Sequence, residues 1–281
     1  MFYFLHNFEP QPIFLSLGFL NIRWYGIFVV LGITVGLVLT IYLAKRFQKK
    51  LDLVWDLLFY LVIWGLVGAR LYEVFLFWPY YQNNLLQIFQ IWKGGLAIHG
   101  ALIAGVIVLW WWTKKHQDSF WHWAAILSPG LAFGQAIGRF GNWFNQELFG
   151  QPTNLPWGIP ITFQNRPLAY QDFSFFHPTF LYESLGLLIL ATALFFLLKK
   201  TKTLSEKKSV SILALYLIGA SLLRFFLEFI KIDSAPLIFS WRWPQFFSFI
   251  LVIITLIGYL IYLYHHEKHS SLRPVWNSKK S

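Results

Sequence analysis

The sequence has no cysteine, a single methionine and very few charged residues. The absence of cysteine excludes a disulfide framework, a cysteine nucleophile and a cysteine-rich zinc site. Charged residues make up 12% of the 281 residues, against about 25% in an ordinary soluble domain. The sequence also lacks an HExxH motif, a histidine cluster with metal-ligand spacing and a glycine-rich nucleotide motif. No metal or nucleotide site is therefore indicated by these motifs, and much of the surface must face something other than water.

Long apolar stretches dominate the chain, and 57% of its residues are hydrophobic. A membrane-spanning helix needs about 20 mostly apolar residues. Seven stretches approach that length: Trp24–Ala44, Leu57–Trp78, Leu96–Trp112, Phe120–Ile137, Thr179–Leu198, Ser209–Ile230 and Gln245–Tyr264. The fourth contains Pro129 and Gly130 and is expected to be broken there. The sequence predicts an all-α integral membrane protein with about seven transmembrane helices, which form a single membrane domain over residues 1–281.

The basic residues alternate between successive loops and predict the orientation. Fifteen Lys and Arg residues follow the first, third, fifth and seventh spans, and six lie on the other side. Because short basic loops stay in the cytoplasm, the N-terminus is predicted outside and the C-terminus in the cytoplasm. The net charge of +11 therefore reflects topology and does not indicate nucleic-acid binding.

One predicted connection is too long to be a simple linker. Residues 139–178 lie on the predicted outer side between the fourth and fifth spans, and they are rich in Gly, Asn, Pro and aromatic residues. Long connections are usually functional or disordered, and the many apolar side chains favour a folded region. We expect this loop to fold against the outer membrane surface.

Two pairs of opposite charge lie inside predicted spans. Arg70 and Glu73 are three residues apart, and Arg224 and Glu228 are four apart, so each pair shares one helix face. Ionisable groups in a bilayer are costly and mark candidate functional sites. Each pair is open to two interpretations, a self-neutralising pair that holds the bundle together or part of a site. In the second case Glu228 would orient Arg224, whose planar guanidinium matches phosphate oxygens.

A histidine and a polar string complete the candidate residues. His99 lies at the outer start of the third span, either as a packing residue or as a general base. The string at residues 134–150 contains Arg139, Glu147, two Asn and two Gln among several glycines. Glycines allow backbone N–H groups to approach an anion, and the alternative is a tight loop that packs on the helix ends.

Six blocks of sequence stand in one order across residues 23–228: Arg23-Trp24-Tyr25-Gly26, Gly68-Ala69-Arg70-Leu71, Trp92-Lys93-Gly94-Gly95 with His99-Gly100, Gly138-Arg139-Phe140-Gly141-Asn142-Trp143-Phe144-Asn145-Gln146-Glu147, His177-Pro178-Thr179-Phe180-Leu181-Tyr182-Glu183, and Arg224-Phe225-Phe226-Leu227-Glu228. In content and order they resemble the signatures of the prolipoprotein diacylglyceryl transferase family. Three single positions depart from the family pattern, with Ala125 for Asp, Trp143 for Phe and Lys231 for Arg. A fourth departure is the stretch before the last span, where the family has G-Q-x-L-S and this sequence reads Trp243-Pro244-Gln245-Phe246-Phe247-Ser248.

Enzymes of this family transfer the diacylglyceryl group from phosphatidylglycerol to the thiol of a lipobox cysteine in prolipoproteins. A thioether forms and glycerol phosphate leaves, which is the first step of bacterial lipoprotein maturation. The resemblance implies a cofactor-free transferase of the bacterial inner (cytoplasmic) membrane, with its active site towards the outer side. Its partners would be phosphatidylglycerol, prolipoprotein signal peptides with a lipobox cysteine, and the bilayer.

The resemblance also implies roles for individual residues. Arg139 and Arg224 would bind the phosphate, and His99 would take the thiol proton, which makes these three the catalytic candidates. The remaining positions would hold the lipid head group and the peptide: Tyr25, Arg70, Asn142, Asn145, Glu147, Gly150, Tyr182, Glu183 and Glu228.

Two other classes of protein remain open from the residues alone. A transporter or channel would suit seven spans with intramembrane charge pairs, although no repeated pair of broken helices is visible. Another lipid-modifying enzyme, such as a phosphatidyltransferase, would usually show an Asp-rich metal motif, whereas only Asp52 and Asp56 fall near a span.

Overall fold

The computed structural model describes residues 2–18 and 20–271. Contacts divide the chain into two compact units, residues 1–40 with 127–281 and residues 41–126. Helices α2 (Trp24–Arg46) and α6 (Phe120–Phe144) begin in one unit and end in the other. The single membrane domain over residues 1–281 stays a prediction.

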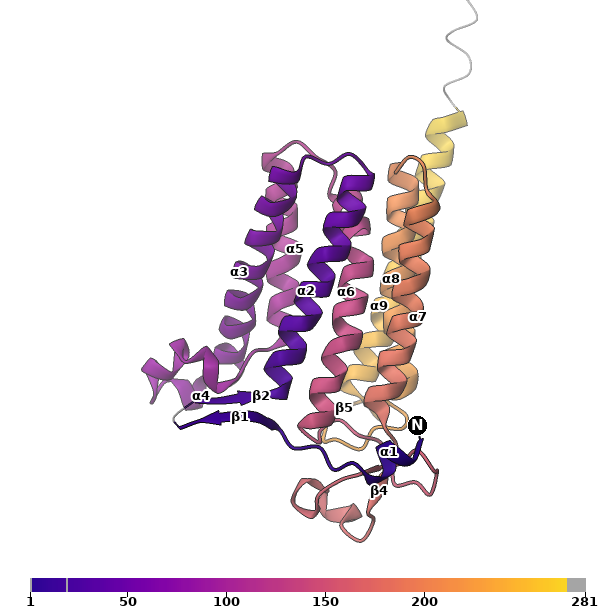
Figure 1. Ribbon diagram of the computed structural model, residues 1–281. Coiled ribbons are helices and arrows are strands. Elements are labelled where there is room, and N and C mark those ends of the chain that lie inside the picture. The colour runs from indigo at the N-terminus through magenta and orange to yellow at the C-terminus, as the bar shows by residue number, and fades with distance from the viewer. Residues whose placement is uncertain (1, 19, 272–281) are drawn as a thin grey trace, which may run out of the picture. The chain divides into compact units, whose positions relative to one another are not determined.

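The first unit contains three consecutive long helices that pack as neighbours (Figure 1): α7 (Thr179–Lys200), α8 (Glu206–Leu227) and α9 (Trp243–Ser271). Successive helices from α6 to α9 run in opposite directions (Figure 1). As a result, the C-terminal ends of α6 and α8 and the N-terminal ends of α7 and α9 lie at one end of this unit, which we term the loop end.

Glycines join α2 to α6 within the first unit. A Cβ atom on Gly32 would stand 2.8 Å from the carbonyl oxygen of Gly134, and one on Gly130 would stand 2.7 Å from that of Gly36. Side chains other than hydrogen would therefore force the two backbones apart. Such close approach is the main source of helix association in lipid, where burial of apolar surface adds little.

The second unit is built around α3 (Leu51–Leu76) and α5 (Ile98–Lys115). A Cβ atom on Gly100 would stand 2.2 Å from the carbonyl oxygen of Gly68, so these helices also meet backbone to backbone. Their connection contains helix α4 (Trp78–Tyr81) and the 3₁₀ turns η1 (Leu85–Phe89) and η2 (Ile91–Lys93).

All seven predicted spans are helices, and five of them are long and apolar enough to cross a membrane: α2, α3, α7, α8 and residues Trp243–Lys268 of α9. The protein is therefore mostly helical and multi-pass. α5 and α6 do not meet the same measure among the described residues. The count of seven spans and the orientation stay predictions, and Arg273, Lys279 and Lys280, which contribute to the orientation, lie outside the described residues.

Two expectations about the fourth span were wrong. The helix is continuous through Pro129 and Gly130, because Gly130 serves for close packing on Gly36. The helix also runs to Phe144, so the loop begins at residue 145 and not at residue 139. Gly141 does not end the helix, since a Cβ atom there would stand 2.7 Å from the ring of Tyr25.

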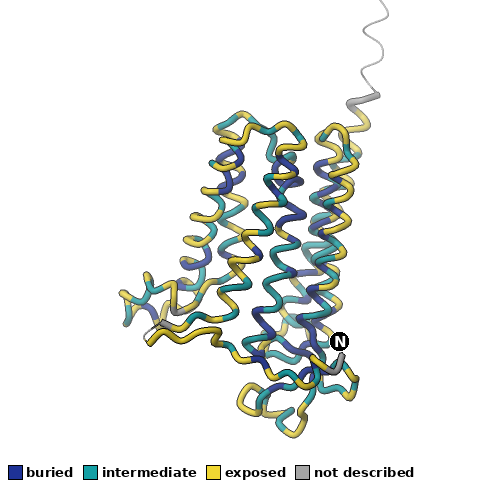
Figure 2. Tube along the Cα trace, viewed as in Figure 1, coloured by how far each residue is buried: buried dark blue, intermediate teal, exposed yellow. Residues whose placement is uncertain are grey.

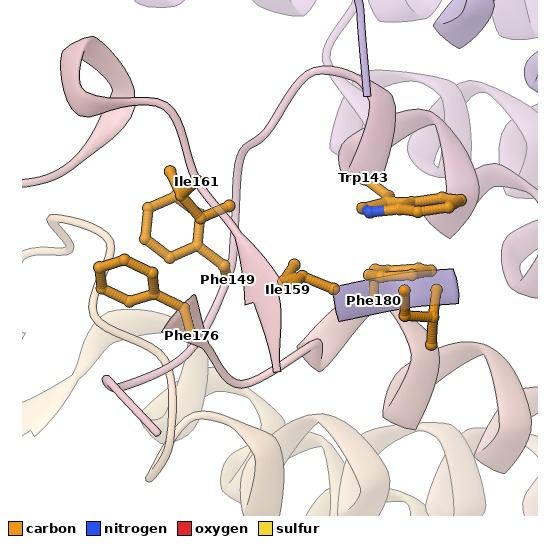
Figure 3. Close-up of a cluster of buried hydrophobic side chains, with 7 residues drawn as sticks. Trp143, Phe149, Ile159, Ile161, Phe176 and Phe180 are labelled. Atoms are coloured by element: carbon orange, nitrogen blue, oxygen red, sulfur yellow. The ribbon is translucent and has the colours of Figure 1, made fainter. Parts of the chain in front are cut away.

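The connection at 145–178 is a folded region. It contains the paired strands β3 (Ile159–Pro160) and β4 (Phe175–Phe176) and the 3₁₀ turns η3 (Phe163–Asn165) and η4 (Leu168–Tyr170). Its core is a cluster of buried apolar side chains drawn in Figure 3, namely Leu5, Trp143, Phe149, Ile159, Ile161, Phe176 and Phe180. Trp143 at the end of α6 stacks on Phe180 at the start of α7, with ring centroids 5.0 Å apart.

The N-terminal segment completes this region. Helix α1 (Phe2–Asn7) contributes Leu5 to the buried cluster, and the Nδ1 atom of His6 lies 3.1 Å from the carbonyl oxygen of Gly158. The antiparallel pair β1 (Ile13–Leu17) and β2 (Leu20–Arg23) then leads directly into α2. Figure 2 shows that burial in the first unit concentrates along its helices and continues into the loop end.

Candidate functional site

Six charged side chains, from three helix ends and from the connection between α8 and α9, converge at the loop end of the first unit. We term this group the charge cluster: Arg139 of α6, Glu183 of α7, Arg224 of α8, Glu228, Lys231 and Arg242. The placement follows from the helix directions, because α6 and α8 end where α7 begins. A cation in the last turn of α8 and a carboxylate near the start of α7 also suit the helix dipoles.

Glu183 is the centre of this cluster and is almost fully buried. Its Oε1 lies 2.7 Å from Nη2 of Arg139, and its Oε2 lies 3.1 Å from Nζ of Lys231 and 3.6 Å from Nη1 of Arg224. One carboxylate thus orients three cations. A buried charge with several such contacts is stable only while its partners stay in place.

Glu228 is the second buried carboxylate, with no exposed side-chain area. Its Oε1 lies 2.9 Å from Nε of Arg224 and 3.8 Å from Lys231, and its Oε2 lies 3.2 Å from Nε of Arg242. The predicted orientation of Arg224 by Glu228 is therefore present as a contact. Whether Glu228 also binds substrate stays a prediction.

The charge cluster carries an excess of positive charge, with four cations against two carboxylates. The excess remains when Asp233, which pairs with Arg242 at 3.1 Å, is counted. Both carboxylates are buried, whereas the side chains of Arg139 and Arg224 are each 25% exposed. The accessible groups are therefore guanidinium donors, and the arrangement is suited to binding an anion.

Lys231 lies deeper than the two exposed arginines. Its side chain is 1% exposed, and burial lowers the pKa of its amine while Glu183 opposes the shift and Arg224 and Arg139 add to it. Its distances to both carboxylates show that it links them. Lys231 acts inside the cluster, because its amine is not exposed to a ligand.

Helix α6 ends beside the charge cluster in a Schellman motif. The amide of Glu147 donates to the Asn142 carbonyl at 3.0 Å, the amide of Gln146 donates to the Trp143 carbonyl at 2.9 Å, and Gln146 has φ +53°. This pattern satisfies the last carbonyls of a helix and usually has Gly at the left-handed position. Here Gln146 occupies it, because its side chain donates to the Pro10 carbonyl and accepts from the Thr162 amide.

The Schellman motif brings four of the predicted site residues together. The side-chain amide of Asn142 donates to Oε1 of Glu147 at 2.7 Å and that of Asn145 donates at 3.3 Å, while Nη1 of Arg139 donates to Oδ1 of Asn142 at 3.2 Å. Nε of Arg139 and Oδ1 of Asn145 are buried and have no hydrogen-bond partner among the described residues. A donor and an acceptor therefore remain for a polar ligand.

The other predicted residues of the first unit border this group. Tyr25 packs its ring over Gly141 and is 40% exposed. Gly150 pairs with Lys231 as a β-bridge, and its amide donates to the His177 carbonyl at 3.0 Å. A Cβ atom on Gly150 would stand 2.8 Å from the side chains of His177 and Ile230, so glycine is required there for close packing.

The hydroxyl of Tyr182 forms hydrogen bonds with side chains of the folded loop. Trp157 Nε1 donates to its hydroxyl at 2.9 Å, and the hydroxyl lies 3.1 Å from Nδ1 of His177. An indole N–H only donates, so the Tyr182 hydroxyl accepts from Trp157, and the direction of its bond with His177 depends on the tautomer of the ring. Burial lowers the pKa of His177, which favours the neutral ring.

Two predicted residues, Arg70 and His99, belong to the second unit. Arg70 is buried and donates to four backbone carbonyls, those of Gln87 at 2.5 Å, Ile88 at 2.8 Å, Gly94 at 2.8 Å and Gly95 at 2.7 Å. Among the described residues no ion pair joins it to Glu73, so the self-neutralising pair was wrong. Four of the five guanidinium donors are used, and Arg70 holds the loop that precedes α5.

His99 lies in the first turn of α5, where its side chain is exposed. Its ring lies 6.0 Å from that of Tyr72. This contact is loose, so tight packing does not account for the histidine. Its role as a base stays a prediction.

Sequence reasoning missed two members of the cluster: Arg242 was used only for the topology, and Lys231 for the topology and as a departure from the family pattern. Both lie beyond the predicted end of the sixth span, where a basic residue is ordinary. For Lys231, spacing is the signal that could have revealed it, because it follows Glu228 by three residues and can reach that carboxylate.

The fold and the site define a class, a multi-pass helical membrane protein with an arginine-rich cluster of net positive charge where its helices meet a folded loop. Residues 12–262 match the family model described as prolipoprotein diacylglyceryl transferase, and the chain belongs to that family. It is similar to proteins named phosphatidylglycerol–prolipoprotein diacylglyceryl transferase from three organisms. The relative from Synechocystis sp. is 41% identical, with 97% of this chain and 95% of the relative covered. The relative from Synechococcus elongatus is 40% identical (91% and 88% covered), and the one from a Synechococcus sp. is 43% identical (80% and 81% covered).

Proposed function

We propose that the charge cluster binds the phosphate of phosphatidylglycerol while its diacylglyceryl group is transferred to a prolipoprotein. Through its family, the chain is a transferase that moves this group from phosphatidylglycerol to prolipoproteins in the first step of lipoprotein maturation. A single observation carries the proposal: the side chains of Arg139 and Arg224 are partly exposed, whereas their carboxylate partners, Glu183 and Glu228, are buried.

The reaction makes two demands on the protein. The sulfur of the lipobox cysteine attacks a glycerol carbon, a C–S bond forms, and the C–O electron pair leaves with glycerol phosphate. The thiol must first lose its proton, because the thiolate is the nucleophile. The departing phosphate gains negative charge, which charged donors stabilise best in a site that excludes water.

Arg139 and Arg224 would stabilise the negative charge of the departing phosphate. Glu183 holds one edge of each guanidinium, so the orientation is set before the substrate binds and little entropy is lost on binding. The unpaired Nε of Arg139 adds a donor towards the same region. Both arginines would stabilise the departing phosphate more strongly than the starting diester, because it carries more charge.

The polar group at the end of α6 would hold the glycerol head group. Hydroxyls of the head group both donate and accept hydrogen bonds, and Oδ1 of Asn145 and the exposed carboxylate of Glu147 offer acceptors. Asn142 links this group to Arg139. Tyr25 and Tyr182 would border the head group or the peptide. Gly150 would allow the backbone there to pack closely against His177 and Ile230.

We propose that His99 takes the proton of the lipobox thiol, directly or through a water molecule. Its exposed imidazole in the first turn of α5 is free to meet a peptide thiol, and histidine is well suited to proton transfer near neutral pH. Arg70 would act indirectly, by holding the loop that precedes His99.

We place the enzyme in the bacterial inner membrane with seven spans, its N-terminus and active site towards the outer side and its C-terminus in the cytoplasm. The asymmetry of Lys and Arg along the sequence supports this orientation. Both substrates are then available in the bilayer, phosphatidylglycerol as a lipid and the prolipoprotein through its signal helix.

The proposal is tested by reconstituting the protein with phosphatidylglycerol and a lipobox peptide and measuring the peptide mass. The expected result is a gain of one diacylglyceryl group that requires the peptide cysteine and persists in the presence of a chelator. A folded protein that produces no gain with several lipids and peptides would overturn the proposal. Transport of a solute without peptide modification would favour the alternative of a transporter.

A further inference from the structure

We propose that Arg242 is a positioning residue, which keeps the outer donors of Arg224 open to a phosphate by holding the far oxygen of Glu228. The inference rests on the proposed function and adds to it a residue that neither the sequence signatures nor the family match identifies. It concerns how the anion site is kept open.

The first observation is the division of the Glu228 carboxylate between two arginines. Nε of Arg224 lies 2.9 Å from Oε1, and Nε of Arg242 lies 3.2 Å from Oε2. The closest approach of the third cation, Lys231, is also to Oε1, at 3.8 Å. Of the three cations paired with Glu228 in the described residues, Arg242 is the one whose closest approach is to Oε2.

The second step follows from how arginine binds carboxylates. A guanidinium and a carboxylate that are free to choose form two parallel N–H···O bonds. The closest contact of Arg224 with Glu228 joins Nε to Oε1, and the closest contact of Arg242 is with the other oxygen. Neither oxygen of Glu228 has a hydrogen-bond partner among the described residues, so the bidentate pair with Arg224 is not formed. If Oε2 were released, it could turn towards an Nη atom of Arg224 and close the bidentate pair. The donors that the proposed function assigns to phosphate would then be occupied.

Arg242 is itself firmly held. Its Nη2 donates to the Asp233 carbonyl at 2.8 Å and lies 3.1 Å from Oδ1 of Asp233, and its Nη1 donates to the Lys231 carbonyl. The side chain is 16% exposed. These contacts fix the guanidinium between the end of α8 and the start of α9, so it can hold Glu228 without moving.

The hairpin that carries Arg242 is unusual in its turn. Strands β5 (Leu237–Ile238) and β6 (Trp241–Arg242) are joined by Phe239 and Ser240, with φ of +48° and +65°. Two consecutive residues other than Gly in the left-handed region are strained, and Phe239 is 87% exposed, so burial of the tip does not offset the strain. Strained backbone of this kind is often retained where a side chain must be placed accurately.

A simpler interpretation is that Arg242 only braces the loop at 231–242. Arg166 provides a matched control, because it also donates to two backbone carbonyls, those of Ile161 at 2.8 Å and Gln171 at 2.9 Å, and no ion pair of Arg166 to a carboxylate is seen in residues 2–18 and 20–271. Arg166→Gln therefore removes loop bracing alone, whereas Arg242→Gln removes bracing and the hold on Glu228.

The experiment compares Arg242→Gln, Arg242→Lys and Arg166→Gln in nanodiscs. For each variant we would measure phosphatidylglycerol affinity by titration, KM and kcat for transfer, and the thermal midpoint. Arg242→Gln is expected to raise Kd and KM for the lipid about tenfold, the effect of losing one charge-assisted contact. The change in kcat should stay below about threefold, because lipid binding and not the chemical step is affected. Arg242→Lys should restore part of the affinity, and Arg166→Gln should leave KM unchanged even if its thermal midpoint falls.

A double-mutant cycle separates the two interpretations further. When Glu228→Gln is already present there is no carboxylate to turn, so Arg242→Gln should add less than about twofold to KM. A wild-type KM and Kd in Arg242→Gln, an equal rise in Arg166→Gln, or full additivity with Glu228→Gln would each overturn the inference. If Arg242→Gln does not fold, Arg242→Lys alone and with Glu228→Gln decides the same question. A folded wild-type protein that neither binds the lipid nor transfers it would instead refute the proposed function.

Discussion

Replacing Glu183 by Gln should destabilise the protein more than any other single change in the charge cluster. The variant keeps the shape of the side chain but removes the carboxylate that lies 2.7 to 3.6 Å from Arg139, Lys231 and Arg224. Loss of one partner from a buried ionic group costs about 3–5 kcal/mol. For chains of comparable length each kcal/mol lowers the thermal midpoint by about 2–4 °C, so a fall of roughly 10 °C is expected.

The test of this reasoning is compensation by a second change. Lys231 is 1% exposed and depends on Glu183 as its nearest anion, so in the Glu183→Gln background its buried charge is a further cost. Lys231→Met alone should cost about 1–3 kcal/mol through the lost hydrogen bond to Glu183. The double variant Glu183→Gln/Lys231→Met should be more stable than Glu183→Gln alone, because it removes a cation together with its partner.

The assay is thermal unfolding in detergent, followed by tryptophan fluorescence at one fixed scan rate, because unfolding of such proteins is commonly irreversible. Glu183→Asp is the control, since it keeps the charge and shortens the side chain. Destabilisation by the two single changes that simply adds in the double variant would show that Glu183 and Lys231 act independently. The description of Glu183 as the centre of the cluster would then be wrong.

Three further predictions follow. Arg139→Ala should abolish transfer and leave membrane insertion intact, which separate measurements of product mass and membrane fractionation would check, and normal activity would contradict the phosphate role. The lowered pKa of His177 means that its contribution to stability is complete above about pH 6.5 and is lost as pH falls through the lower folded value. Thermal midpoints should therefore fall between pH 7 and pH 5 by less in His177→Gln than in the wild type. Ser240→Gly should raise stability by about 0.5–1 kcal/mol by relieving the left-handed residue, and Ser240→Ala should give no gain in the same denaturation assay.

Much of the fold could be predicted from the sequence because each element depends on local properties. Length and hydropathy predicted all seven long helices, and the predicted start of α7 at Thr179 agrees with the structure. The six sequence blocks predicted the family that the comparison assigns over residues 12–262. Such features need no knowledge of what each residue packs against, because a bilayer requires long apolar helices wherever they sit.

The errors arose where a neighbour in space changes the role of a residue. Pro129 and Gly130 resemble helix breakers in sequence, but Gly130 is a site of close contact with Gly36, and α6 is continuous and ends at Phe144, beyond the predicted end at Ile137. Arg70 was paired with Glu73 by spacing, whereas its donors reach carbonyls 17 to 25 residues away. Loop carbonyls cannot be predicted as partners from residue type, because every residue has one.

The candidate site shows the same division. The sequence by itself determined which residue types are present, namely arginines, carboxylates, amides and a histidine in recognisable blocks. Only the tertiary structure decided that Lys231 and Arg242, ordinary basic residues at the end of a span, share two buried carboxylates with Arg139 and Arg224. The physical reason is that an ion pair depends on separation in space, and helices that end at the same level bring together charges more than 100 residues apart in the chain.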